Sequence, residues 1–176
     1  MALEGELPAR VSWLTAAAEP DWDAVYAEQL PRVFNFFRYR FGHDALAEDL
    51  TARTFEKAWL ARKRYRRDLA GFATWLLSIA RNVAVDHWRA EQHHLPLDAA
   101  AEVPAADAPH DEIAHASDLA RLTALVRGLA PREQELVALK YGAEATNRAI
   151  AELTGLSESN VGTILHRAVQ ALRRDW

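Results

Sequence analysis

The segment GLSESNVGTILHRAVQALRR, residues 155–174, holds the pattern that decides the fold of this chain. A glycine, which tolerates a positive φ angle, is followed by Ser157, a residue type that caps helix N-termini. Apolar side chains then recur at helical spacing, so we expect a final helix with one buried stripe. The expected members of this stripe are Val161, Leu165, Ala168, Val169 and Leu172.

The preceding residues extend this pattern to a helix-turn-helix over 147–174. Asn147 is the expected cap of a short helix that ends at Thr154. Opposite the buried stripe, the last helix carries hydroxyls, an imidazole, an amide and a guanidinium, which suit contacts to bases and phosphates. The two helix N-termini suit phosphates as well. From spacing alone, an amphipathic hairpin with a solvated polar face is equally compatible. The candidate DNA-binding residues are Asn147, Ser157, Ser159, Thr163, His166, Arg167 and Gln170.

Three further helices are predicted nearer the N-terminus, at about 21–41, 45–64 and 71–92. Asp21 is the expected cap of the first and Gly42 its stop, and Pro31 predicts a kink or a break inside it. Asp44 is the expected cap of the second. The inward-facing candidates of the second and third helices are Leu46, Leu50, Phe55, Trp59, Phe72, Trp75, Leu76, Ile79 and Val83.

Between the two groups of helices the composition changes. Residues 95–117 hold prolines, many alanines and only acidic charges, and they offer too few large apolar groups to form a core. We therefore expect an all-α protein in which two small helical domains, 21–94 and 118–176, are joined by an acidic flexible linker. Residues 1–20 are expected to form a loose leader.

Composition excludes several classes of protein. The 176 residues contain no cysteine, which excludes disulfides and thiolate metal sites and fits the reducing cytoplasm. The N-terminal residues match a secretion signal poorly, and no apolar run approaches the length of a membrane span, so we expect neither secretion nor membrane insertion. His87, His93 and His94 lack a convincing carboxylate partner, so we expect no metal or other cofactor. No acid–base groups converge, so an enzyme built around these histidines is a weak alternative, and we expect no catalytic residue.

Four longer motifs resemble characteristic segments of a bacterial family. They are AEDLTARTFEKAW (47–59), FATWLLSIARNVAVDHWR (72–89), LAPREQELVALKY (129–141) and LTGLSESNVGTILHRAVQAL (153–172). In this order, around an acidic linker, they resemble RNA polymerase sigma factors of the extracytoplasmic-function type (ECF, group IV). The resemblance covers about 21–94 and 118–174.

The resemblance implies a function for each domain. Residues 21–94 would be sigma region 2, which binds core RNA polymerase and melts the −10 element, and 118–176 would be region 4, which recognises the −35 element. The implied partners are promoter DNA and core RNA polymerase, through its β′ clamp and β flap. The resemblance also allows an anti-sigma factor as a further partner. The competing hypothesis is a stand-alone helix-turn-helix regulator whose N-terminal helices serve for sensing or dimerisation.

The candidate residues of region 2 form two sets. A charged face of the second helix suits docking to the polymerase, although a solvated helix face is the simpler interpretation: Asp44, Glu48, Asp49, Arg53 and Glu56. Cations and an aromatic platform around the third helix suit an unstacked −10 strand, and Tyr65 is a further stacking candidate. The −10 set is Arg66, Arg67, Asp68, Arg81, Asn82, Trp88 and Arg89.

The last helix departs from the family at two positions. Relatives commonly carry basic residues where this chain has Gly162 and Ile164. The recognition of the −35 element therefore depends more heavily on Thr163, His166 and Arg167.

Overall fold

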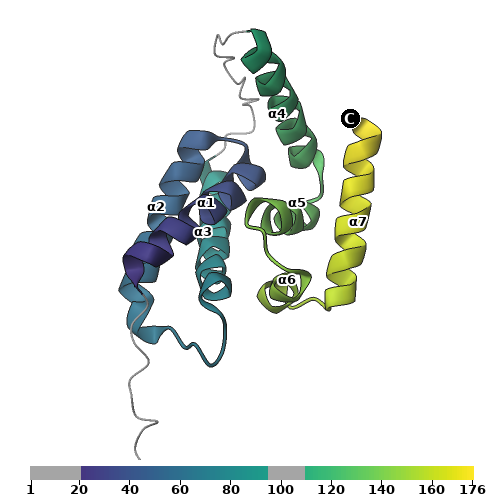
Figure 1. Ribbon diagram of the computed structural model, residues 1–176. Coiled ribbons are helices and arrows are strands. Elements are labelled where there is room, and N and C mark those ends of the chain that lie inside the picture. Colours follow the sequence, from purple (N-terminus) through teal and green to yellow (C-terminus); the bar gives the residue numbers. More distant parts are fainter. Residues whose placement is uncertain (1–20, 95–109) are drawn as a thin grey trace, which may run out of the picture.

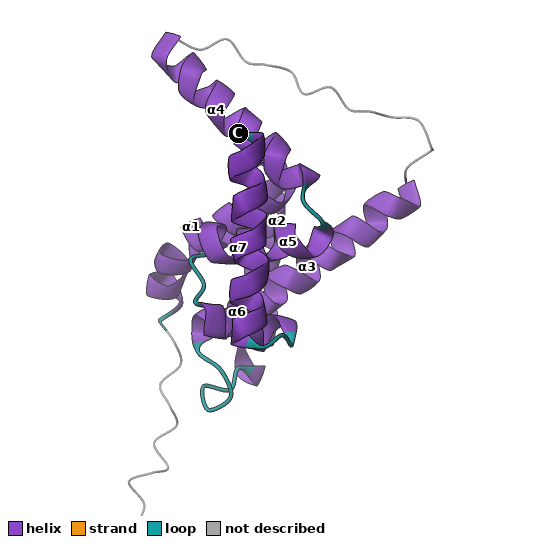
Figure 2. Cartoon of the chain, turned by 90° about the vertical axis from the view of Figure 1, so that its right-hand side faces the viewer, coloured by secondary structure: helices purple, strands orange, loops and turns teal. Residues whose placement is uncertain are grey.

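The computed structural model describes residues 21–94 and 110–176, and every regular element in these ranges is helical (Figure 2). The predicted leader 1–20 and residues 95–109 of the predicted linker lie outside the described residues. The N-terminal half contains α1 (Trp22–Phe41), α2 (Asp44–Ala61), a short 3₁₀ turn (Arg62–Arg64) and α3 (Phe72–His94). The C-terminal half contains α4 (His110–Gly128), α5 (Pro131–Val137), the wide turn η2 (Ala138–Gly142), α6 (Asn147–Thr154) and α7 (Glu158–Asp175).

The ends of α1 follow the sequence prediction. The Asp21 side chain accepts hydrogen bonds from the backbone amides of residues 23 and 24, and Gly42 ends the helix with a φ of 73°. Of the predicted kink or break at Pro31, the break is absent, because α1 is one continuous helix through that residue. The predicted cap of α2 is displaced by one residue. His43 holds the cap position, and Asp44 is the first helical residue.

The core of the N-terminal half is formed by facing apolar stripes of α1, α2 and α3, with Phe36, Phe37, Leu50 and Leu76 fully buried. Trp59 departs from its predicted inward position. It lies near the end of α2, where its ring is 48% exposed and meets the edge of Trp22 at 5.3 Å. Trp59 is therefore half-buried against the start of α1 and does not belong to the buried core.

The C-terminal half contains the predicted helical hairpin, with two boundary corrections. The helix α4 begins at His110, so the last eight residues of the predicted linker 95–117 are helical. Thr146, and not Asn147, caps α6, because its hydroxyl accepts a hydrogen bond from the Ala149 amide. The turn at Gly155 has a φ of 71°, as expected for a glycine turn, and the hydroxyl of Ser157 caps α7.

The two halves pack against each other along one interface, which we call the seam (Figure 1). The wide turn η2 lies against α1, and α5 and α6 also contact the N-terminal half. Gly142 is central to this approach, since a Cβ at this position would lie 2.7 Å from the backbone oxygen of Asn35. The predicted two helical domains are present, and their buried residues form a single core cluster across the seam.

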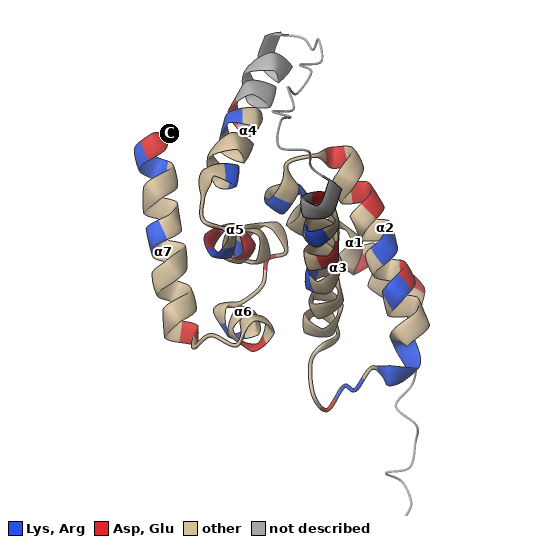
Figure 3. Ribbon diagram, turned by 180° about the vertical axis from the view of Figure 1, so that it is seen from behind, with Lys and Arg blue, Asp and Glu red and all other residues tan. Residues whose placement is uncertain are grey.

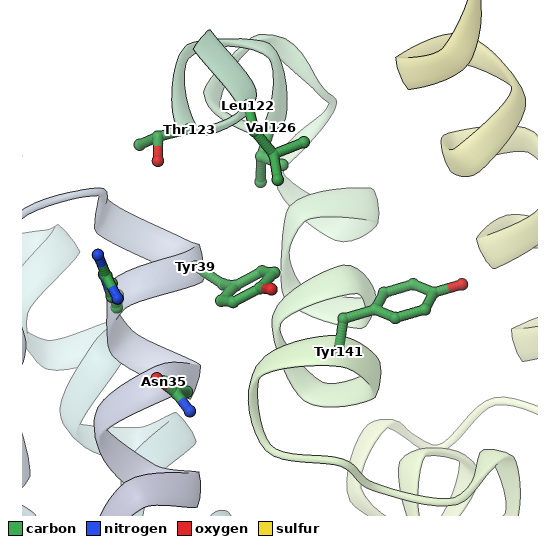
Figure 4. Close-up of a pocket in the computed structure, with 7 residues that line it drawn as sticks. Asn35, Tyr39, Leu122, Thr123, Val126 and Tyr141 are labelled. Atoms are coloured by element: carbon green, nitrogen blue, oxygen red, sulfur yellow. The ribbon is translucent and has the colours of Figure 1, made fainter. Parts of the chain in front are cut away.

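A small cavity marks the upper part of the seam (Figure 4). Tyr39 extends from α1 into the space below Leu122 and Val126 of α4, whereas Tyr141 points away from α1. Side-chain packing between α1 and α4 thus supplements the backbone contact made by η2.

Candidate functional site

The polar face of α7 is the first part of the candidate site. Val161, Leu165 and Ala168 are buried, as predicted, and Val169 and Leu172 are partly buried. Consequently the opposite face is turned to solvent. It carries the exposed candidates Ser159, Thr163, His166, Arg167 and Gln170.

Local hydrogen bonds order the start of this face. The Ser157 hydroxyl accepts a hydrogen bond from the Asn160 amide at 3.2 Å, so this oxygen is engaged in capping. The Thr163 hydroxyl donates to the backbone oxygen of Ser159 at 3.0 Å, which fixes the direction of the threonine side chain. Such a preset face presents its methyl and hydroxyl groups to a ligand with little loss of side-chain entropy.

A groove runs beside α7 and brings two of the candidates together with Asn147. It has a volume of about 330 Å³, and His166 and Gln170 line one wall. Arg173 of the same polar face lines it as well, together with Lys140, which was not among the candidate residues. Lys140 lies in η2, just outside the hairpin motif, so only the path of the chain shows that its charge joins this groove.

The two unusual residues of α7 have different surroundings. Ile164 is partly buried and packs against the core cluster, so position 164 does not face solvent with the polar residues. Gly162 lies beside Asn147, and a Cβ there would meet the amide nitrogen of Asn147 at 3.7 Å, an ordinary contact. The Asn147 side-chain oxygen is shielded from solvent and has no hydrogen-bond partner, which makes it a poor candidate for a direct phosphate contact.

The charged face of α2 is the second part. Its predicted members, Asp44, Glu48, Asp49, Arg53 and Glu56, are all exposed, and together they leave a net negative face. Asp49 pairs with Arg53 at 2.8 Å one turn later, and Asp44 pairs with Arg38 of α1 at 3.0 Å. Both are surface pairs of small energetic weight, so the carboxylates can exchange them for an external partner.

An apolar groove lies next to this face, between α1 and α2. It has a volume of about 480 Å³, and Glu48, which belongs to the charged face of α2, is one of its lining residues. The groove was not predicted, because Tyr26, Leu30 and Phe34 fall on the same stripe of α1 as the core residues. Its lining residues are Tyr26, Leu30, Pro31, Phe34, Glu48, Thr51 and Ala52.

The candidate −10 residues are split between the two ends of α3. Arg66, Arg67 and Asp68 lie in the exposed loop before the helix, whereas Trp88 and Arg89 lie near its other end, about 25 Å away along the axis. Arg66 holds Asp68 in a bidentate pair, with its hydrogen bond and charge lowering the pKa of that carboxyl.

Tyr65 and Arg81 are engaged within the protein. The Tyr65 ring packs on Phe72 and Trp75 at centroid distances of 5.3 and 5.1 Å, so it is not free to stack on a base. Arg81 reaches across the seam, where its Nε donates to the Glu135 carboxylate at 2.8 Å and its Nη1 to the Leu153 carbonyl. Asn82, the next residue, is exposed.

The histidine prediction needs one correction. His87 Nε2 lies 3.3 Å from a carboxylate oxygen of Glu91, so a carboxylate partner is present, although the two groups make no hydrogen bond. The imidazole also packs against the Phe41 ring in a T-shaped arrangement, with the ring centroids 5.2 Å apart. Within residues 21–94 and 110–176, no group of three potential ligands is placed to hold a metal ion, and no helix has the length and apolarity to cross a membrane.

Comparisons with known proteins give a consistent picture. Residues 25–94 match the family model of Sigma-70 region 2, and 119–172 match that of Sigma-70, region 4. The ECF RNA polymerase sigma factor BldN of Streptomyces coelicolor is 30% identical over 90% of this chain, which spans only 61% of the length of BldN. The RNA polymerase sigma factor CarQ of Myxococcus xanthus is 31% identical over 89% of both chains.

Solved structures share the fold. The sigma factor RpoE from Bartonella quintana, in a complex with the anti-sigma factor NepR, superposes with a TM-score of 0.69 at 20% identity. The match covers 88% of this chain and 96% of that one. CnrH, solved with the cytosolic domain of CnrY, gives a TM-score of 0.60 over 87% of this chain.

Proposed function

The chain belongs to the ECF sigma factors, and on that premise we propose that it directs core RNA polymerase to a specific set of promoters and initiates transcription there. The observation that carries the proposal is the exposed polar face of α7 opposite its buried stripe. The direct test is transcription by bacterial core polymerase with and without the purified chain, with all transcript starts sequenced. A shared upstream sequence motif at the new starts supports the proposal, and an unchanged set of starts refutes it.

The acidic face of α2 and the neighbouring apolar groove are proposed as the polymerase docking surface. A carboxylate row beside an apolar groove fits the cationic and apolar side chains of a helical element such as the β′ clamp. The double reversal Glu48→Lys, Asp49→Lys is expected to weaken core binding by at least tenfold, because both attractive charges become repulsive. The matched control is Glu152→Lys, Asp175→Lys, which changes the net charge equally on the other half of the chain. Equal affinity of the two variants contradicts this assignment.

The polar face of α7 is proposed to recognise the −35 element from the major groove. Arg167 is the proposed base-reading residue, since a guanidinium can contact guanine through two hydrogen bonds worth about 1–3 kcal/mol of discrimination. Run-off transcription on promoters with each −35 position varied tests this role. We expect Arg167→Ala to reduce transcription most on the preferred promoter and to preserve core binding. Uniform loss on all variants would make Arg167 a phosphate contact instead.

The −10 element is proposed to contact α3 and the loop before it. Arg66, Arg67, Asn82, Trp88 and Arg89 are accessible for this contact, whereas Arg81 first has to leave Glu135. The packed arrangement of the two halves would then have to open before all these residues meet one DNA strand. Permanganate footprinting of the melted −10 strand with Arg67→Ala and Trp88→Ala tests the assignment.

One further partner and one alternative function can each be tested by a binding assay. An anti-sigma factor is proposed as a protein that covers the groove between α1 and α2, so it should compete with core polymerase for binding to this chain. The stand-alone regulator remains the alternative. It would require specific binding of duplex −35 DNA without polymerase, which an electrophoretic mobility assay of the isolated chain decides.

A further inference from the structure

A second and larger cleft lies on the seam, with a volume of about 700 Å³. The ends of α1 and α3 form its wall on one side, and α4 and α5 form the other. We call it the arginine cleft, because five arginines line it against only two glutamates, Glu91 and Glu135, which gives a formal charge of +3 with histidine neutral. Its arginines are Arg40, Arg81, Arg89, Arg127 and Arg132.

This concentration of positive charge runs against the charge of the whole chain, which is −4. The arginines that line the cleft belong to α1, α3, α4 and α5, and Figure 3 marks Lys and Arg positions in blue. Like charges held together in a partly dehydrated cleft repel one another, and the repulsion destabilises the packed state unless an anion is present. The cleft is therefore a candidate for an anionic ligand.

The acids already present neutralise only part of the charge. Glu135, which is buried, accepts from Arg81 at 2.8 Å and from Arg132 at 3.1 Å, so one carboxylate serves two guanidinium groups. Glu91 lies against His87. In the described part of the chain, Arg89 and Arg127 form no ion pair.

Arg40 has the least favourable surroundings of the five. Its pKa is lowered chiefly by burial, with Glu135 acting in the opposite direction and Arg81 adding to the decrease. Among the described residues, its side chain donates a hydrogen bond only to the Pro131 carbonyl, at 3.5 Å, the limit of such a contact. An anion between α1 and α5 would supply Arg40 with a charged acceptor.

The shape and chemistry of the lining narrow the ligand class. Guanidinium groups bind phosphate oxygens through paired hydrogen bonds, and a formal charge of +3 calls for an anion with several charges. Trp88, which is 48% exposed, lines the same cleft and offers a flat apolar surface to a base. The volume lies in the range of ordinary small-molecule pockets.

We propose that the arginine cleft binds a small molecule with an oligophosphate chain, either inorganic or attached to a nucleoside. Because three of the arginines belong to the N-terminal half and two to the C-terminal half, the bound anion bridges the seam. Binding therefore stabilises the packed arrangement of the two halves. Arg81, Trp88 and Arg89 of this cleft are also proposed −10 contacts. The binding test uses neither polymerase nor promoter, so its failure can be distinguished from a failure of the proposed promoter function.

The experiment is calorimetric titration of the full chain with tripolyphosphate at constant ionic strength. We expect saturable binding at one site and a higher melting temperature in the presence of the ligand. Arg89→Gln and Arg127→Gln, one from each half, should each lower the affinity about tenfold, because each removes a charge-assisted contact. Arg148→Gln is the matched control, since Arg148 is an exposed arginine of α6 that pairs with Glu152 at 3.4 Å.

Further titrations identify the source of the phosphate chain. Tighter binding of adenosine triphosphate than of tripolyphosphate, with the difference lost in Trp88→Leu, supports a nucleotide. Equal binding of both supports an inorganic chain. Affinity that is the same in wild type, Arg89→Gln and Arg127→Gln overturns the proposal. A single-stranded oligonucleotide that binds where tripolyphosphate does not also overturns it, because the cleft is then a nucleic-acid contact only.

Discussion

Gly142 controls how closely the two halves approach, and its replacement by alanine should open the seam. A Cβ at this position would lie 2.7 Å from the backbone oxygen of Asn35 and 3.1 Å from the Cα of Phe36. Both are main-chain atoms of α1, so no flexible side chain can move aside. The glycine has no positive φ angle, and the substitution therefore adds no backbone strain of its own.

The size of the effect follows from the cost of overpacking. Inserting a methyl group into a closely packed contact typically costs about 1–3 kcal/mol. This energy falls on the packed arrangement and not on the separated halves, so it shifts the equilibrium between them about 5- to 150-fold toward separation. A minor separated population would thereby become measurable.

Energy transfer between two dyes can measure this shift. The chain contains no cysteine, so cysteines introduced at exposed Lys63 and Arg174 would be the only labelling sites. We expect Gly142→Ala to lower the transfer efficiency and to add a second, low-transfer population. Gly128→Ala is the control, because a Cβ at that position meets no atom within 4 Å. Identical transfer in the two variants would refute the role assigned to Gly142.

Three smaller predictions concern local structure. Gly155→Ala should lower the free energy of unfolding by about 1 kcal/mol, which corresponds to a melting temperature lower by about 2–4 °C. The added methyl group meets no neighbouring atom, so the cost comes from the positive φ angle that alanine would have to adopt. An unchanged melting curve would contradict this. Ser157→Ala should cost a similar amount, about 1 kcal/mol in urea unfolding, through loss of the cap, and a stability equal to wild type would show that the cap is unimportant. In Arg66→Gln the carboxyl of Asp68 should titrate at a higher pH by NMR than in wild type. The ion pair with Arg66 lowers the pKa of Asp68. The stabilisation from this pair is therefore present above the ordinary carboxyl pKa and is lost as the pH falls through the lowered pKa. An equal titration midpoint in both proteins would exclude the pair in solution.

The helical elements could be predicted because their signals are local. Asp21, Gly42, Gly155 and Ser157 end or begin helices through their own side chains or φ angles, and the periodic stripes identified the buried face of α7. The errors are of the same local kind. Thr146 caps α6 in place of its neighbour, since both residue types suit that position.

The seam could not be predicted in this way. Contacts between α1 and η2 join residues more than a hundred positions apart, and no periodicity encodes them. Arg81 therefore appeared to be a solvent-facing cation for DNA, although it lies on Glu135. The arginine cleft was missed for the same reason. Its arginines are spread over four helices, and only packing brings Arg40 beside Arg132.

The length of the wide turn Ala138–Gly142 determines how α6 and α7 are rotated around the axis of α5. A π turn accommodates an additional residue compared with α-helical winding, and each residue of an α-helix rotates the chain by about 100°. Deleting one residue from this turn would therefore direct Gly142 away from α1 or rotate α6 and α7 around the axis of α5. The length of these five residues thus couples two properties that would otherwise vary separately: how the halves meet, and in which direction the polar face of α7 points. We expect this segment to tolerate substitutions far better than insertions or deletions.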